Sequence, residues 1–137
     1  MLILRGCSGC GKSTFAEFLQ TLVPTAVVCS ADSFMYEQGV YKFSHKKLGY
    51  CHISCMHKYK NALELGTEVV IVDNTNTKAK DYTFYEDLAH EKGYMVFCLI
   101  VENAHNGKDI HNVPEATLQG QAANILNSLR LLPSGAA

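Results

Sequence analysis

The sequence lacks three features that would place it in a class at once. No run of apolar residues approaches the roughly 20 residues that a membrane-spanning helix needs. The chain enters an apolar stretch at Leu2–Leu4 directly, which leaves no room for a signal peptide. Twelve basic and 13 acidic residues leave a net charge of −1, so the composition announces no strongly basic surface for nucleic acid. We therefore expect a cytoplasmic protein without a membrane partner.

Internal repeats and a linker are also absent from the pattern. The 137 residues suit one compact domain, and 47% of them are hydrophobic, which is enough for a core. The prediction is a single domain over residues 1–137.

Six cysteines call for an interpretation. A disulfide framework is not expected in a cytosolic domain of this size. Cys7 and Cys10 form a C-x-x-C, for which a redox pair is the minor alternative. Cys51, Cys55 and His57 faintly resemble metal ligands, but in a helix His57 does not share the face of the two cysteines. The favoured interpretation of this second group is buried or half-buried side chains that pack in the core.

The most informative motif is G-x-x-x-x-G-K-S over residues 6–13, between an apolar run and a helical pattern. Strand, glycine-rich turn and helix are the context of a phosphate-binding loop, whose backbone N–H groups surround phosphate oxygens. Lys12 is expected to reach the β- and γ-phosphates and Ser13 to hold Mg²⁺, so ATP and Mg²⁺ are the predicted cofactors. The predicted nucleotide-binding residues are Ser8, Gly9, Cys10, Gly11, Lys12, Ser13 and Thr14.

Strand and helix patterns alternate along the rest of the chain. Strands are predicted at residues 2–4, 26–29, 69–72 and 94–101, and helices at about 12–23, 44–65, 78–92 and 114–131. Ser44 is the predicted N-cap of the second helix, whose inward residues are Leu48, Cys55, Tyr59 and Ala62. This order predicts an α/β fold of the P-loop NTPase type, adenylate-kinase-like. It has a parallel sheet of about four to five strands, helices on both faces and a lid loop.

In such sheets ligands bind beyond the carboxyl ends of the strands, so the polar segments found there are the candidate site. Asp73 ends an apolar strand and is predicted to complete the Mg²⁺ site with Ser13, the alternative being a turn residue. Asp32 suits a carboxylate that orients an attacking hydroxyl and accepts its proton, the alternative being a helix cap. Asn74, Thr75 and Asn76 suit sugar or phosphate contacts, or simply a turn.

A polar segment at about residues 102–114 is predicted to form a mobile lid. Lys108 lies in it. Phosphoryl transfer benefits from a cation that closes over the γ-phosphate, so Lys108 is a candidate catalytic residue. A solvated surface lysine is the alternative interpretation.

The chain resembles the polynucleotide 5′-kinase branch of P-loop kinases, which includes NEDD4-binding-protein-2-like proteins and phage polynucleotide kinases. The resemblance covers about residues 1–118 and rests on four segments, at residues 4–14, 28–32, 39–43 and 71–76. It implies ATP-dependent phosphorylation of a 5′-hydroxyl on DNA or RNA. By motif match, Asp32 takes the general-base position, Lys12 and Ser13 the triphosphate–Mg²⁺ positions, and Lys108 replaces the usual lid arginine.

The resemblance has departures that keep other functions open. Met35 stands where phage enzymes often carry an arginine. A basic rim is a candidate replacement, and a solvated helix start is the slightly favoured alternative for its residues Lys42, His45, Lys46 and Lys47. The first alternative is a kinase acting on a small molecule, such as a nucleoside, sugar or antibiotic. The second is a nucleotide-binding interaction module with little turnover.

Overall fold

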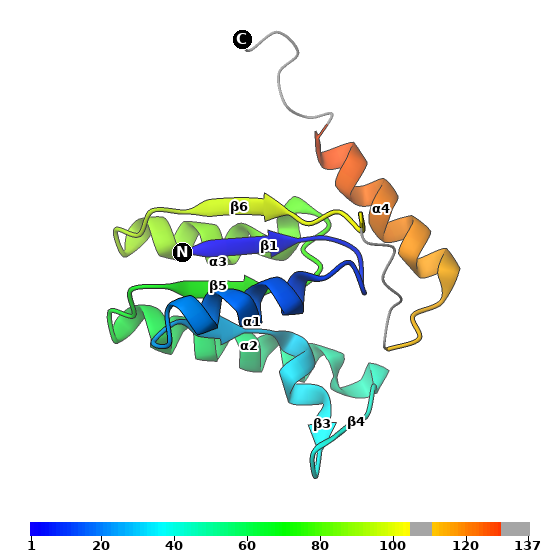
Figure 1. Cartoon of the computed structure of the whole chain (residues 1–137), viewed down its shortest axis with the longest axis horizontal. Coiled ribbons are helices and arrows are strands. Elements are labelled where there is room, and N and C mark those ends of the chain that lie inside the picture. The colour runs from blue at the N-terminus through cyan, green and yellow to red at the C-terminus, as the bar shows by residue number, and fades with distance from the viewer. Residues whose placement is uncertain (105–110, 130–137) are drawn as a thin grey trace, which may run out of the picture.

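The computed structural model describes residues 1–104 and 111–129. Its centre is a four-stranded sheet made of β1 (Leu2–Arg5), β2 (Val27–Cys29), β5 (Val70–Asp73) and β6 (Phe97–Ile100). The strands are parallel and lie in the order β2-β5-β1-β6. The helices are α1 (Lys12–Leu22), α2 (Leu48–Glu64), α3 (Ala79–Glu91) and α4 (Glu115–Leu129). The predicted α/β fold is confirmed, and Figure 1 shows the strands running side by side.

Helices cover both faces of this sheet, because each buried strand alternates its side chains between them. Leu4 and Ile71 pack with Ala16 on the face of α1, which lies in front of the sheet in Figure 1. On the other face Ile3 and Val72 belong to a larger core cluster that includes residues of α2 and α3, among them Cys55, Tyr59 and Tyr85. The predicted burial of Cys55, Tyr59 and Ala62 is confirmed.

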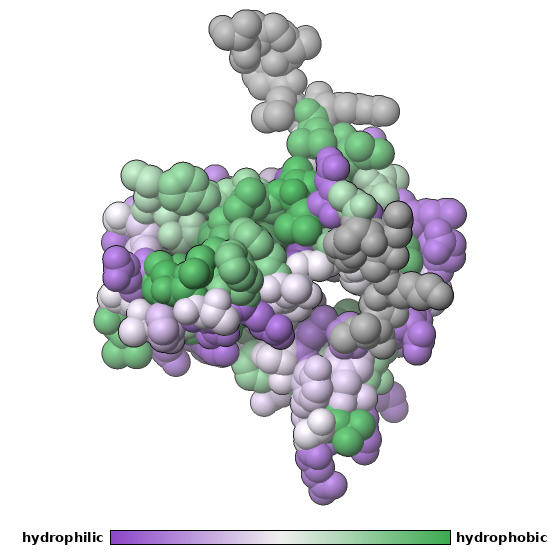
Figure 2. Space-filling view, in the orientation of Figure 1, coloured by the Kyte–Doolittle hydropathy of each residue, from purple (hydrophilic) through white to green (hydrophobic). Residues whose placement is uncertain are grey.

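Strand β6 forms one edge of the sheet and is shorter than predicted. Its register places Phe97 beside Leu2 and Leu99 beside Leu4, so both side chains lie on the α1 face. They stay 57% and 43% exposed, because α1 packs against β1 and β5. Figure 2 shows hydrophobic surface on this side of the molecule.

A β-hairpin occupies a segment for which neither a strand nor a helix was predicted. Strands β3 (Tyr36–Glu37) and β4 (Val40–Tyr41) pair antiparallel after the 3₁₀ helix η1 (Ala31–Met35). The two residues between them, Gln38 and Gly39, both have positive φ, which is the backbone of a tight hairpin turn.

The start of the second helix also differs from the prediction. Residues His45–Lys47 form the 3₁₀ helix η2, and α2 begins only at Leu48. The Ser44 side chain makes no cap hydrogen bond, so the predicted N-cap is wrong. Leu48 is 37% exposed and does not face the core, because it lies in the first turn of α2, beyond the sheet.

Candidate phosphoryl-transfer site

The phosphate loop connects β1 to α1 and is shaped by its glycines. Gly9 and Gly11 have φ of 78° and 103°, in the left-handed region that glycine adopts without strain. A Cβ on Gly6 would lie 2.6 Å from Cys10 Sγ and 2.7 Å from the carbonyl oxygen of Val101. The close approach of β1 and the end of β6 therefore requires glycine at position 6.

Lys12 is held inside its own loop. The side chain is only 8% exposed, and its Nζ donates to the carbonyl oxygens of Gly6 at 3.0 Å and Cys7 at 2.8 Å. These carbonyls partly offset the cost of burying an ammonium group. A cation is thereby positioned at the start of α1, where the helix dipole also favours an anion.

Ser13 and Asp73 meet across the carboxyl end of the sheet. The Ser13 hydroxyl donates to Asp73 Oδ2 at 2.7 Å, although the residues are 60 positions apart. Burial raises the pKa of the Asp73 carboxyl above its ordinary value, and the negative charge of Asp32 adds to the increase. The hydrogen bond from Ser13 and the positive charge of Lys12 oppose this increase in the pKa. A hydroxyl beside a carboxylate is a set of hard oxygen donors, so the pair fits Mg²⁺.

Asp32 lies on η1 with its side chain exposed. Its backbone segment is fixed to the neighbouring loop, because the Ala31 N–H donates to Asn74 Oδ1 at 2.8 Å. Asp32 follows β2 and Asp73 ends β5, and these two strands are neighbours in the parallel sheet, so the predicted base and the predicted metal ligand lie at the same edge. The structure thus gathers Lys12, Ser13, Asp73 and Asp32 at the carboxyl edge.

The segment after β5 is hydrogen-bonded to β1 and to the start of the phosphate loop. Gly6 N donates to the Thr75 carbonyl at 3.0 Å, and Asn76 Nδ2 donates to the Leu4 carbonyl at 2.8 Å. Arg5 Nε donates to the Asn76 carbonyl at 2.7 Å. Asn76 is 2% exposed, so its contacts are those of a structural residue. A substrate contact from Asn74, Thr75 or Asn76 stays a prediction.

Two contacts of α4 were missed by sequence reasoning. Gln121 Oε1 accepts a hydrogen bond from the Ser8 N–H at 3.0 Å, and Ser128 Oγ accepts one from Arg5 Nη2 at 2.8 Å. They join the last helix to the phosphate loop and to β1. More than 110 positions separate each pair, and nothing in the local pattern of residues signals them.

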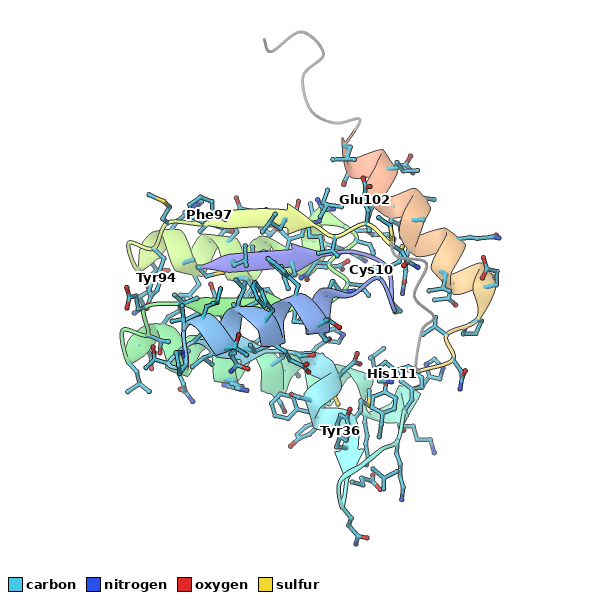
Figure 3. The ribbon with its side chains drawn as sticks, viewed as in Figure 1. Cys10, Tyr36, Tyr94, Phe97, Glu102 and His111 are labelled. Carbon is cyan, nitrogen blue, oxygen red and sulfur yellow. The ribbon has the colours of Figure 1, made fainter. Side chains whose placement is uncertain are left out.

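The hairpin meets the segment that leads into α4. The rings of Tyr41 and His111 are stacked with centroids 3.9 Å apart. Figure 3 shows His111 beside the hairpin, on which Tyr36 is labelled. Figure 2 shows the surface hollowed between the hairpin and the carboxyl end of the sheet. Lys108, with the rest of residues 105–110 of the predicted lid, lies outside the described residues. In the basic rim, Lys42 and Lys47 both pair with Glu37.

Four of the six cysteines are buried, Cys7 is half-buried and Cys98 is exposed. Cys51 and Cys55 are fully buried, as predicted. Burial raises the pKa of Cys29 to about 12 and also raises the pKa of Cys7, so neither thiol is activated as a thiolate.

Comparison with known proteins assigns the family. A family model described as "AAA domain" (AAA_33) matches residues 1–125. The chain belongs to this family. It is also 36% identical over 96 residues to human NEDD4-binding protein 2, which confirms the resemblance seen in the sequence. That stretch is 70% of this chain but only 5% of the relative, so this chain is similar to one small part of a much longer protein.

Solved structures of the same fold include the APS kinase CysC of Mycobacterium tuberculosis. A point mutant of CysC superposes with a TM-score of 0.54 at 17% identity, over 94% of this chain and 96% of that one. CysC in complex with AMPPNP and APS gives the same TM-score at 16% identity, over 93% and 70%. A chain of the Pnkp1/Rnl/Hen1 complex gives 0.52 at 20% identity, over 87% and 37%. The chain therefore has the fold of P-loop kinases. Within the described ranges, no helix is long and apolar enough to cross a membrane.

Proposed function

We propose that this domain is an ATP-dependent polynucleotide 5′-hydroxyl kinase, which transfers the γ-phosphoryl group of ATP to the 5′-hydroxyl of DNA or RNA. The observation that carries the proposal is the gathering of Lys12, the Ser13–Asp73 pair and Asp32 at one edge of the sheet. The similarity to NEDD4-binding protein 2 supports the family background, and Asp32 supplies the base that an alcohol acceptor needs.

Each residue has a defined part in the transfer. The phosphate loop and Lys12 bind the triphosphate and stabilise the charge that develops on the γ-phosphoryl oxygens. Asp32 orients the 5′-hydroxyl and accepts its proton. The hydroxyl oxygen forms a bond to the γ-phosphorus, and the bond to the bridging oxygen breaks, so that ADP leaves with the electron pair.

Mg²⁺ bound by Ser13 and Asp73 would supply charge neutralisation on the β- and γ-phosphates. Lys108 is retained in the proposal as a second cation over the γ-phosphate, from a lid that includes its position.

The second candidate is a small-molecule kinase. It is favoured by the superposition on an APS kinase that covers nearly the whole of both chains. The two functions share the phosphate loop and the base and differ in the acceptor, which is an extended strand in one case and an isolated molecule in the other. An interaction module that binds nucleotide with little turnover is the third candidate.

A panel of acceptors with γ-labelled ATP tests the proposal. We expect label on 5′-hydroxyl oligonucleotides, and weak labelling of free nucleosides and sugars.

Asp32→Asn is expected to lower the rate at least about 10²-fold with little change in ATP binding. Lys12→Ala is expected to lower it about 10²–10³-fold, because a cation is lost from the transition state. Equal use of a nucleoside and an oligonucleotide would support the small-molecule kinase. ATP binding without label on any acceptor would support the interaction module.

A further inference from the structure

A second feature lies beside the catalytic cluster and includes Asn74, Thr75 and Asn76, for which a substrate contact was predicted. It is a pocket of about 350 Å³ between α2 and α3, at the carboxyl end of β5. Helix α2 contributes His52 and Met56, and α3 contributes Lys80 and Phe84. The volume falls in the range of about 300–1,000 Å³ that is usual for small-molecule sites.

One wall of the pocket offers an aromatic surface. Phe84 is 39% exposed although it lies on a helix that packs against the core. Its ring is fixed by an edge-to-face contact with Tyr85, with centroids 5.5 Å apart, and by a tilted contact with Tyr59. Met56 adds a polarisable thioether to the lining. A rigid, half-exposed ring beside a pocket is suited to stacking on a planar ligand.

The hydrogen-bonding groups of the pocket come from the segment after β5. The Asn74 amide is already engaged, because its oxygen accepts from Ala31 N and its nitrogen contacts Cys55 Sγ at 3.6 Å. The Thr75 hydroxyl makes no hydrogen bond within residues 1–104 and 111–129. Asn74 is therefore a fixed part of the wall, and Thr75 supplies a donor and acceptor to a ligand.

The same segment connects the pocket to the site of phosphoryl transfer. Asn74 follows Asp73 in the chain and holds Ala31, the residue before Asp32. A ligand in the pocket thus rests against the loop that carries the predicted metal ligand and fixes the predicted base. A nucleoside is a planar base joined to a sugar, so with the base in the pocket its hydroxyl-bearing part remains at this loop.

The charges around the pocket favour a ligand that continues into phosphate. Lys80 is exposed at the pocket, and His52 lies on the facing helix. The nearby carboxylate of Asp81 is engaged in capping α3, since its Oδ2 accepts from the Lys78 N–H at 3.0 Å. The Lys80 ammonium is therefore available to a phosphate group, and His52 adds a hydrogen-bonding ring on the facing helix.

We infer that the α2–α3 pocket binds the base of the 5′-terminal nucleotide of the acceptor by stacking on Phe84, with the following phosphate near Lys80. This inference rests on the proposed function and adds a recognition element to it: the kinase binds the terminal base as well as the backbone. Base identity is read weakly, because every base has a face that stacks.

The test compares two short 5′-hydroxyl oligonucleotides that differ only in whether the 5′-terminal residue carries a base or is abasic. With the wild-type protein, we expect the abasic strand to have a KM and a dissociation constant about 10-fold higher or more. Phe84→Ala should bring the ratio close to one, and Phe84→Tyr, which keeps the ring, should retain it. Phe18→Ala is the matched control, since Phe18 is 55% exposed on the opposite face.

Binding and turnover are measured separately, by fluorescence anisotropy of 3′-labelled strands and by transfer of label from ATP. Thermal melts of all variants show that they are folded, and the conservative Phe84→Tyr serves where Phe84→Ala is unstable. Equal binding and equal turnover of the two strands by the wild type would overturn the pocket and leave the kinase standing. Preferential binding of the strand with its base, without turnover of either, would keep the pocket and overturn the proposed function.

Discussion

The two faces of the sheet differ in how many apolar side chains are buried on them. On one face, α2, α3 and the neighbouring strands share a cluster of 14 buried residues, and Tyr59, Cys51 and Cys55 are fully enclosed. On the other face, four buried residues lie between α1 and the sheet, and Phe97 and Leu99 remain exposed. The phosphate loop leads directly into α1, on the thinly covered face. The difference indicates that stability is concentrated on the α2–α3 face, while the nucleotide site is next to the face that opens at lower free energy.

The largest expected effect comes from a substitution in the core of the α2–α3 face. Tyr59→Ala removes a fully buried ring and its hydrogen bond to the Tyr85 carbonyl, so we expect a loss of about 3–5 kcal/mol in the free energy of unfolding. Leu22→Ala on α1, where the side chain is 63% exposed, should change stability by less than about 0.5 kcal/mol. Urea denaturation of both variants measures the contrast. Similar losses at the two positions would mean that the faces contribute equally.

The second effect compares two glycines. Gly6→Ala places a methyl group against the Val101 carbonyl oxygen, so β1 and the end of β6 must move apart at a cost of about 1–3 kcal/mol, with weaker ATP binding. Gly49→Ala in α2 meets open space and should stabilise the protein by about 0.5–1 kcal/mol. Thermal denaturation and nucleotide titration follow both. A neutral Gly6→Ala would show that the loop adapts more easily than its contacts indicate.

A smaller effect concerns the buried carboxyl at the site. The pKa of the Asp73 carboxyl is higher in the folded protein than in the unfolded chain, where it is about 3.9. Protonated Asp73 therefore favours the folded state. This contribution to the free energy of unfolding is fully present below the unfolded-state pKa and is lost as pH rises through the folded-state pKa. Near neutral pH, without Mg²⁺ or nucleotide, the wild type therefore carries the cost of a buried charge. Asp73→Asn should melt a few degrees higher there, and the difference should shrink toward acid pH. Scanning fluorimetry across pH checks this, and a lower Tm for Asp73→Asn at neutral pH would contradict it.

The smallest effect is expected at the edge strand. Phe97→Thr keeps a strand-forming residue at an exposed position and should alter stability by less than about 0.5 kcal/mol. Val72→Thr buries a hydroxyl in the core of the α2–α3 face and should lower the free energy of unfolding by about 1–3 kcal/mol. The pair sharpens the comparison within one sheet, and denaturant unfolding is the measurement. A large loss from Phe97→Thr would show that the α1 face is covered in solution.

Much of the candidate site was predictable because its signals are local. The glycines at positions 6, 9 and 11, with Lys12 and Ser13 after them, form a motif whose geometry depends on adjacent residues. The hairpin had a local signal as well, because Gln38-Gly39 is a turn sequence between Tyr36-Glu37 and Val40-Tyr41. Strands of two residues are, however, too short to show alternation. The exposure of Leu48 had none, because the helical pattern does not say where the sheet ends.

The sequence by itself determined the phosphate loop, the alternation of strands and helices, and the polar residues that end each strand, since these depend on local backbone preferences and on burial of apolar runs. Only the tertiary structure decided which of those polar residues meet. The Ser13–Asp73 bond, the Asn74 link to the Asp32 segment and the Gln121 contact with Ser8 arise from the strand order β2-β5-β1-β6 and the docking of α4. Contacts between residues so far apart in the chain produce no periodic pattern in the sequence. Their distances are set by how whole elements pack, and packing follows from the summed burial of many side chains.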